Sequence, residues 1–94
     1  MRKYETMFIL RPTLTEEEVK KFIERINNLV TENKGKIDEE PKYFKRNLAY
    51  AIKKNSSGYY FVFNYEVPSD FNKILSESLK YDEDVLRYMP VVQE

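Results

Sequence analysis

Two stretches of alternating hydrophobic and polar residues, joined by a short polar segment, predict a β-hairpin over residues 44–67. In the first arm, residues 44–54, the side chains of Leu48, Tyr50 and Ile52 fall on one face. In the second arm, residues 59–67, every odd position is large and apolar, and such residues pack well on a pleated sheet. Residues 55–58 are the predicted turn because Gly58 can adopt positive φ. One hairpin face is expected in the core, and the other is expected to be open and partly aromatic.

Residues 2–11 alternate in the same way and predict a further strand, which Pro12 ends. The face expected in the core carries Tyr4, Thr6, Phe8 and Leu10. The opposite face carries Lys3, Glu5, Met7 and Ile9. Because both faces are apolar toward the C-terminal half, this strand is predicted to lie in the middle of the sheet.

Two helices are predicted from caps and helical spacing. Thr15 is the predicted N-cap of the first, and Glu18 three residues later completes a capping box. Gly35 is expected at the position just after this helix, where glycine is favoured. Ser69 is the predicted N-cap of the second helix. The apolar stripes at helical spacing are Val19, Phe22, Ile23, Ile26, Leu29 and Val30 in the first helix, and Phe71, Ile74, Leu75 and Leu79 in the second.

The remaining strands complete a β-α-β-β-α-β order. Residues 36–40 are expected to begin an irregular edge strand that Pro41 interrupts and that continues to residue 52. Residues 85–92 are the predicted last strand, at an edge because Pro90 lacks a backbone donor. This order predicts an α+β ferredoxin-like sandwich, a four-stranded antiparallel sheet with two helices on one face. The first and third strands are expected in its middle. We predict one domain over residues 1–94.

Composition narrows the classes of function. The chain has no cysteine and no histidine, so it lacks disulfides, thiolates, the commonest metal ligand and the usual general base. We expect no metal and no cofactor. No apolar run approaches the ~20 residues of a membrane span, and the N-terminus lacks the apolar segment of a signal peptide. A cytoplasmic location is therefore expected.

The net charge is zero, with sixteen basic and sixteen acidic residues, but the two signs are segregated. Residues 42–54 contain five basic residues and no acidic one, whereas acidic residues predominate in 12–41 and after 65. This basic stretch is compatible with binding a polyanion. It is equally typical of a solvated edge strand whose lysines discourage aggregation, and charge alone slightly favours that second interpretation.

Fold alone does not decide the function, because ferredoxin-like domains include enzymes, small-molecule binders and RNA binders. The acidic clusters at residues 16–18 and 82–84 are explained by helix capping and by a solvated loop, so we predict no catalytic residue. Residues 11–14 lack the glycines of the ferredoxin-like acylphosphatases. An enzymatic or small-molecule-binding domain of this fold remains the alternative.

The RNA-recognition motif has the same element order, and its third-strand signature can be compared with residues 57–64. The two sequences agree at Gly58, Tyr59, Phe61 and Val62, and they disagree at Ser57, Tyr60 and Asn64. That motif stacks bases on the open face of its sheet. Tyr59 and Phe61 are instead expected in the core, so an aromatic core strand is the better interpretation.

Four segments resemble the bacterial small-subunit ribosomal protein six family: residues 1–5 (MRKYE), 45–53 (KRNLAYAIK), 58–60 (GYY) and 84–88 (DVLRY). They occur in order, with the family's spacing, over essentially the whole chain. Phe44 replaces a usual glycine, Ala51 replaces a usual proline, and Pro90 is atypical. The resemblance implies a protein of the small ribosomal subunit without enzymatic activity. It also implies binding to the central domain of 16S ribosomal RNA as a heterodimer with ribosomal protein eighteen.

The candidate RNA-binding residues are basic residues at strand ends or without acidic neighbours: Arg2, Lys3, Lys45, Arg46, Lys53, Lys54 and Arg87. Arg46 and Arg87 are the first choices for phosphate because a guanidinium can bind it with two parallel hydrogen bonds. The candidate partner-binding residues lie on the open face: Met7, Ile9, Tyr60 and Val62. A neutral protein with few free cations is expected to bind RNA poorly without a basic partner. Tyr4 and Tyr50 are expected in the core rather than stacked on bases.

Overall fold

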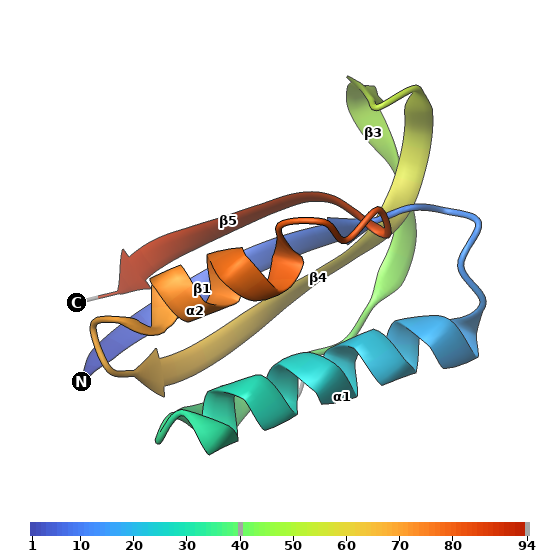
Figure 1. Ribbon diagram of the computed structural model, residues 1–94. Helices are drawn as coiled ribbons and strands as arrows, with labels where there is room; N and C mark the ends of the chain where they lie inside the picture. The colour runs from blue at the N-terminus through green and yellow to red at the C-terminus, as the bar shows by residue number, and fades with distance from the viewer. Residues whose placement is uncertain (40, 94) are drawn as a thin grey trace.

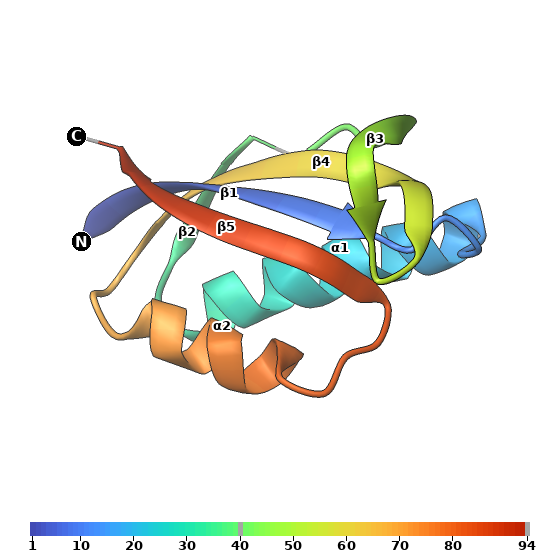
Figure 2. The same ribbon diagram turned by 90° about the horizontal axis from the view of Figure 1, so that it is seen from above.

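The computed structural model describes residues 1–39 and 41–93. Its elements are β1 (Arg2–Leu10), α1 (Glu16–Glu32), β2 (Lys36–Glu39), β3 (Phe44–Ile52), β4 (Asn55–Val67), α2 (Phe71–Leu79) and β5 (Val85–Gln93). The strands form one antiparallel sheet in the order β2-β4-β1-β5, and β3 also pairs with β4. Both helices lie on one face of the sheet (Figure 1), and Figure 2 shows the other face open.

This architecture confirms the ferredoxin-like sandwich, with β1 and β4 in the middle, but the sheet has five strands rather than four. The predicted second strand is divided into β2 and β3, which pair with different parts of β4. Pro41, which cannot donate a backbone hydrogen bond, lies between them. Glu40 was predicted in the same strand and lies outside the described residues. β5 pairs with β1 alone, as expected for a strand containing Pro90.

The core lies between the sheet and the helices, and it contains the alternating residues predicted from the sequence. In β4, Phe61, Phe63, Tyr65 and Val67 are at most 1% exposed. The facing residues of β1, including Tyr4, are buried as well. Both predicted helical stripes pack against this sheet face, with Leu29 and Ile74 only partly buried. The hydrophobic alternation therefore identified the core correctly.

The beginning of α1 has the predicted capping box. The Thr15 hydroxyl accepts a hydrogen bond from the Glu18 backbone N–H at 3.2 Å, and the Glu18 carboxylate accepts one from the Thr15 backbone N–H at 3.0 Å. This second bond, followed by the one from the Thr15 hydroxyl, lowers the pKa of Glu18 below its ordinary value of 4.5. The ionised carboxylate is thus the form that stabilises the folded protein.

Replacing Glu18 with glutamine should therefore reduce stability at neutral pH and matter less in acid. Because the folded pKa of Glu18 lies below the unfolded one, its stabilising contribution is complete above the unfolded pKa and disappears as pH falls through the folded value. The measurement compares the melting temperatures of wild type and Glu18→Gln at pH 7 and at about pH 3. A difference that is the same at both pH values would contradict this role for the carboxylate.

The end of α1 differs from the prediction. Lys34, with φ of 65°, takes the left-handed position expected for Gly35. The Gly35 N–H donates to the Val30 carbonyl at 2.8 Å, and this bond closes the helix one residue earlier than expected, with Asn33 as the C-cap. A Cβ on Gly35 would lie 2.7 Å from side-chain atoms of both Val30 and Val67. Glycine is required here for close packing, not for positive φ.

The hairpin turn was also misplaced. Lys53 and Lys54, with φ of 49° and 69°, form a two-residue turn, and β4 begins immediately afterwards at Asn55. Such paired positive φ values match the twist of a hairpin. Gly58 lies within β4 and does not have positive φ. A Cβ at Gly58 would lie 2.7 Å from the Leu10 carbonyl oxygen, so this glycine allows β1 to approach β4 closely.

A bulge in β3 curls the hairpin over the open face of the sheet. Asn47 pairs with Ser57 and Ile52 pairs with Asn55, so residues 48–51 of β3 face a single residue of β4. The tip reaches the start of β5, where Lys53 Nζ donates to the Val85 carbonyl at 3.4 Å. Because the bulge interrupts the alternation, Tyr50 is 62% exposed, and its predicted burial in the core is wrong.

The second helix begins one residue later than predicted. Its N-cap is Asp70, which makes no side-chain capping bond, and Ser69 lies in the preceding turn. The Phe71 backbone N–H donates to the Pro68 carbonyl at 3.1 Å, so the turn itself supplies a partner for the first helical residue. Neither helix in the described ranges has the length and apolar character needed to cross a bilayer.

Candidate RNA and protein interface

The open face of the sheet carries a row of apolar side chains from several strands. Met7 of β1 lies between Val62 of β4 and Met89 of β5 in the strand register. In the neighbouring row, Tyr60 pairs with Phe44 of β3. We call the following residues the apolar patch: Met7, Phe44, Tyr60, Val62, Met89 and Val91. Phe44, Met89 and Val91 are 42%, 41% and 47% exposed, so the patch offers apolar surface to a partner.

Three of the four predicted partner-binding residues, Met7, Tyr60 and Val62, belong to this patch and are partly exposed. Ile9 shares their face but is only 7% exposed, since it lies against Gly58 beneath the curled hairpin. It therefore offers little surface. The sequence reasoning missed Phe44, Met89 and Val91. The signal for the last two was available, because they follow Arg87 by two and four residues and so share its face of the last strand.

Arg87 and Phe44 lie at opposite ends of the register row that contains Ile9 and Tyr60, and Arg46 stands two residues after Phe44, opposite Gly58. The guanidinium carbon of Arg46 is 4.5 Å from the centre of the Phe44 ring and 5.5 Å from that of Tyr60. Arg87 pairs with Ile9 on the other side, and its Nη1 donates to Tyr50 Oη at 2.7 Å. Stacking on aromatic rings orients a guanidinium without neutralising its charge. Both arginines are thus held in place with their charge retained.

None of the seven predicted RNA-binding cations forms an ion pair with a carboxylate in the described residues. The ion pairs found there join Arg11 to Asp84 at 2.6 Å, Arg25 to Asp82 at 2.6 Å and Lys21 to Glu17 at 3.9 Å. The Asp84 bond raises the pKa of Arg11. Asp84, Asp82 and Glu17 are thus paired with cations outside the candidate site. On the open face, the acidic residues Glu5 and Glu66 lie toward the Lys3 end, where Glu66 is opposite Lys3 and Glu5 is opposite Val91 in the register.

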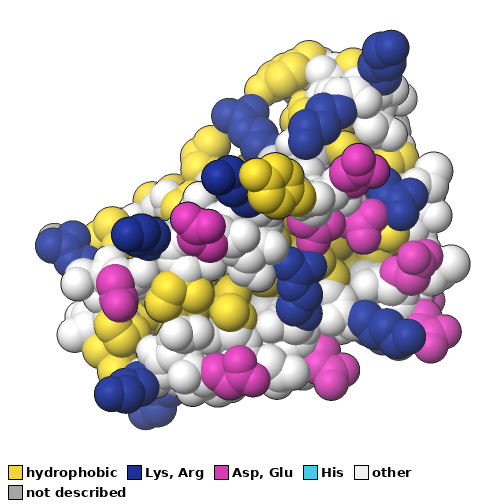
Figure 3. Space-filling model, in the orientation of Figure 1, with side chains coloured by type: hydrophobic (Ala, Val, Ile, Leu, Met, Phe, Trp, Pro, Cys, Tyr) yellow, Lys and Arg dark blue, Asp and Glu magenta, His cyan; other side chains and the backbone are white. Residues whose placement is uncertain are grey.

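The structure brings only part of the predicted cationic set together. Lys53 and Lys54 form the hairpin tip, and Lys53 reaches β5 two residues before Arg87. Over the hairpin, Figure 3 shows basic and hydrophobic side chains, whereas acidic and basic side chains are mixed over the rest of that view. We call Arg46, Arg87, Lys53 and Lys54 the cationic rim.

The other three predicted cations lie apart from this rim. Lys45 pairs with Tyr59 rather than with an open-face residue, and its Nζ is 5.6 Å from the centre of the Tyr59 ring. Lys3 shares the open face but lies six residues from Ile9 along β1, which corresponds to about 20 Å of strand. Arg2 precedes it and alternates to the other face. These residues would have to meet a different part of any long ligand.

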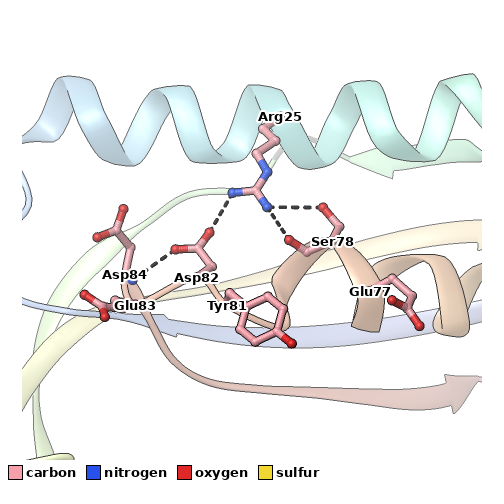
Figure 4. Close-up of a pocket in the computed structure, with 7 residues that line it drawn as sticks. All are labelled: Arg25, Glu77, Ser78, Tyr81, Asp82, Glu83 and Asp84. Carbon is pink, nitrogen blue, oxygen red and sulfur yellow. Dashed lines mark hydrogen bonds and ion pairs between the residues drawn. The ribbon is translucent and has the colours of Figure 1, made fainter.

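A surface depression between the helices is explained by structural contacts (Figure 4). Arg25 of α1 reaches across it, donating from Nη1 to Asp82 Oδ2 at 2.6 Å and from Nη2 to the Ser78 carbonyl at 2.7 Å. A cation bound to a carbonyl in the last turn of α2 stabilises that helix end. Within the described ranges no group of three or more acidic residues is arranged to hold a metal ion. The contacts that Arg25 makes across the depression therefore hold the two helices together, and we assign no ligand to it.

Comparison with known proteins identifies relatives over the length of the chain. The family model described as Ribosomal protein S6 matches residues 3–91. The small ribosomal subunit protein bS6 of Thermoanaerobacter pseudethanolicus is 46% identical over 89 residues, covering 95% of this chain and 94% of the relative. The bS6 protein of Campylobacter curvus is 40% identical over 94 residues, covering all of this chain and 66% of the relative.

A solved structure supports the same relationship. The crystal structure of 30S ribosomal protein S6 from Thermotoga maritima superposes with a TM-score of 0.89 at 31% sequence identity. The superposition covers 98% of this chain and 87% of the other. The overall fold of this chain has therefore been observed experimentally in a related protein.

Proposed function

The chain belongs to the ribosomal protein S6 family, whose members are structural components of the small ribosomal subunit and not enzymes, and we propose that it binds the central domain of 16S ribosomal RNA together with ribosomal protein eighteen. The observation that carries this proposal is the open sheet face, where cations without an ion pair among the described residues border exposed apolar side chains. Such a surface suits an RNA and a protein that meet side by side.

The apolar patch supports the protein part of the proposal. Phe44, Met89 and Val91 come from β3 and β5, on either side of the two central strands, so the exposed apolar surface extends across the width of the sheet. Protein interfaces place apolar and aromatic residues at their centre and polar residues at the rim. We therefore assign the patch to the partner protein and the cationic rim to the RNA.

The charge supports the need for a partner. The whole chain is neutral, so it gains no long-range attraction toward a polyanion. Three or four phosphate contacts would make the affinity depend only weakly on salt, with a logarithmic slope of about −3 to −4. A basic protein bound to the apolar patch would add cations beside the rim. Cooperative binding of protein, partner and RNA follows from this arrangement.

The test measures affinity for a central-domain ribosomal RNA fragment with and without ribosomal protein eighteen. Replacing both Arg46 and Arg87 with alanine should weaken RNA binding, measured with ribosomal protein eighteen present, roughly 30- to 100-fold. This factor corresponds to about 1 kcal/mol or more for each lost phosphate contact. The salt slope should decrease by about 0.7 to 0.9 for each arginine. The matched control replaces Lys20 and Lys73, exposed lysines on the helices, and should bind like wild type.

Two results would contradict the proposal. The first is a wild-type protein that does not bind this RNA at moderate salt even when the partner is present. The second is a double arginine variant whose melting temperature falls well below that of wild type, since these exposed side chains would then be structural. Substitution of Met89 by aspartate should weaken the partner complex without RNA, which tests the assignment of the apolar patch separately.

A further inference from the structure

Tyr50 is an exposed aromatic residue that lies next to Arg87 of the cationic rim. The bulge at residues 48–51 of β3 directs it out of the sheet, and it is 62% exposed. The ring therefore contributes little to the core and leaves its apolar surface accessible to a ligand. Its hydroxyl is held by Arg87 at 2.7 Å, which fixes the ring beside a guanidinium.

The surroundings of Tyr50 are cationic. Residues 42–54 contain no acidic side chain, and Lys53 and Lys54 follow in the adjacent turn. Arg87 donates one of its five N–H groups to the tyrosine hydroxyl, and the other four remain for a phosphate. A nucleotide offers a flat base and a phosphate at a short separation. The ring and the guanidinium are the two groups that would recognise them.

We propose that Tyr50 stacks on an unpaired base of the RNA while Arg87 binds a neighbouring phosphate. This inference rests on the proposed function and adds a base-contacting residue to it. The exposed ring is the stacking surface, because its hydroxyl is already occupied by Arg87. An RNA base is favoured over a protein as the partner of Tyr50, since Arg87 binds its hydroxyl, Lys53 and Lys54 follow in the turn, and the apolar patch is centred on Met7.

The experiment measures RNA affinity in the presence of ribosomal protein eighteen for three variants. Tyr50→Ala should bind the RNA about 10- to 100-fold more weakly because the stacking surface is lost. Tyr50→Phe should stay within about 3-fold of wild type, since the ring remains. Tyr81→Ala is the matched control, because Tyr81 is 86% exposed and also lies beside a cation, Lys80, but is followed by three acidic residues, 82–84. It should bind like wild type.

Salt dependence separates stacking from phosphate binding. The salt slope for Tyr50→Ala should equal that of wild type, whereas Arg87→Ala should lower the slope by about 0.7 to 0.9. A second readout uses the absence of tryptophan from the chain. Tryptophan introduced by Tyr50→Trp should change its fluorescence when RNA is added to the protein pair. Tryptophan introduced by Tyr81→Trp should not respond.

Three outcomes would overturn the inference while the proposed function still stands. In the first, wild type binds the RNA and Tyr50→Ala binds equally well. In the second, Tyr50→Ala weakens the affinity for ribosomal protein eighteen, measured without RNA, by the same factor, so that Tyr50 contacts protein. In the third, Tyr50→Phe binds as poorly as Tyr50→Ala, which would assign the effect to the hydroxyl. Failure of wild type to bind the RNA would instead contradict the proposed function itself.

Discussion

Replacing Phe8 with alanine should lower the free energy of unfolding by about 3–5 kcal/mol, the typical cost of removing a fully buried aromatic ring. Phe8 is 0% exposed, and its ring centre lies 5.3 Å from that of Phe61, 5.6 Å from Phe22 and 5.7 Å from Phe63. It therefore joins both central strands to α1. Urea denaturation followed by circular dichroism measures the change.

The same substitution at Phe44 is the matched control. Phe44 is 42% exposed and contacts mainly Tyr60 and Arg46, so alanine there should cost about 1 kcal/mol or less. A loss at Phe8 as small as that at Phe44 would mean that the aromatic cluster is not the centre of the core. If Phe8→Ala does not fold at all, Phe8→Leu provides a milder variant that should still be less stable than Phe44→Ala.

Replacing Thr6 with valine should have the second large effect, a loss of about 1–3 kcal/mol. The Thr6 hydroxyl and the Tyr65 hydroxyl form a hydrogen bond of 2.6 Å, and both residues are 0% exposed. Valine has a similar shape but leaves the tyrosine hydroxyl buried without this partner. Tyr65→Phe should also reduce stability, because it leaves the buried Thr6 hydroxyl without this partner. The double variant should lose less than the sum, since neither polar group then remains.

High pH provides an independent check on Tyr65. Burial, which outweighs the hydrogen bond from Thr6, raises the pKa of Tyr65 to about 12 from its ordinary value of 10. Because the folded pKa exceeds the unfolded one, this group's contribution is complete below pH 10 and is lost as the pH rises toward 12. Wild type should lose more stability than Tyr65→Phe between these pH values. Equal losses in the two proteins would show that Tyr65 does not cause the alkaline sensitivity.

The candidate site was partly visible in the sequence. Arg46, Arg87, Tyr60 and Val62 were predicted and do lie on the open face, because charge segregation and strand alternation depend only on residue order. The exposure of Tyr50 was not predictable in this way. It depends on a bulge, and a bulge inverts the faces of a strand without leaving a clear mark in the hydrophobic pattern.

The sequence by itself determined the features that arise from neighbouring residues. The capping box of Thr15 and Glu18 needs only a spacing of three residues, and the buried face of β4 needs only a period of two. These local preferences act before any long-range contact forms. Element order and the handedness of crossovers then lead from them to the ferredoxin-like sandwich.

Only the tertiary structure decided the role of Gly58 and the contact between Tyr50 and Arg87. Gly58 suits either a turn or a close approach of strands, and only its distance to the Leu10 carbonyl shows that the second applies. Likewise, Tyr50 and Arg87 are 37 positions apart and meet because the hairpin curls over β5. A contact of this kind depends on register, twist and packing between segments that are remote in the chain, so no local pattern of residues encodes it.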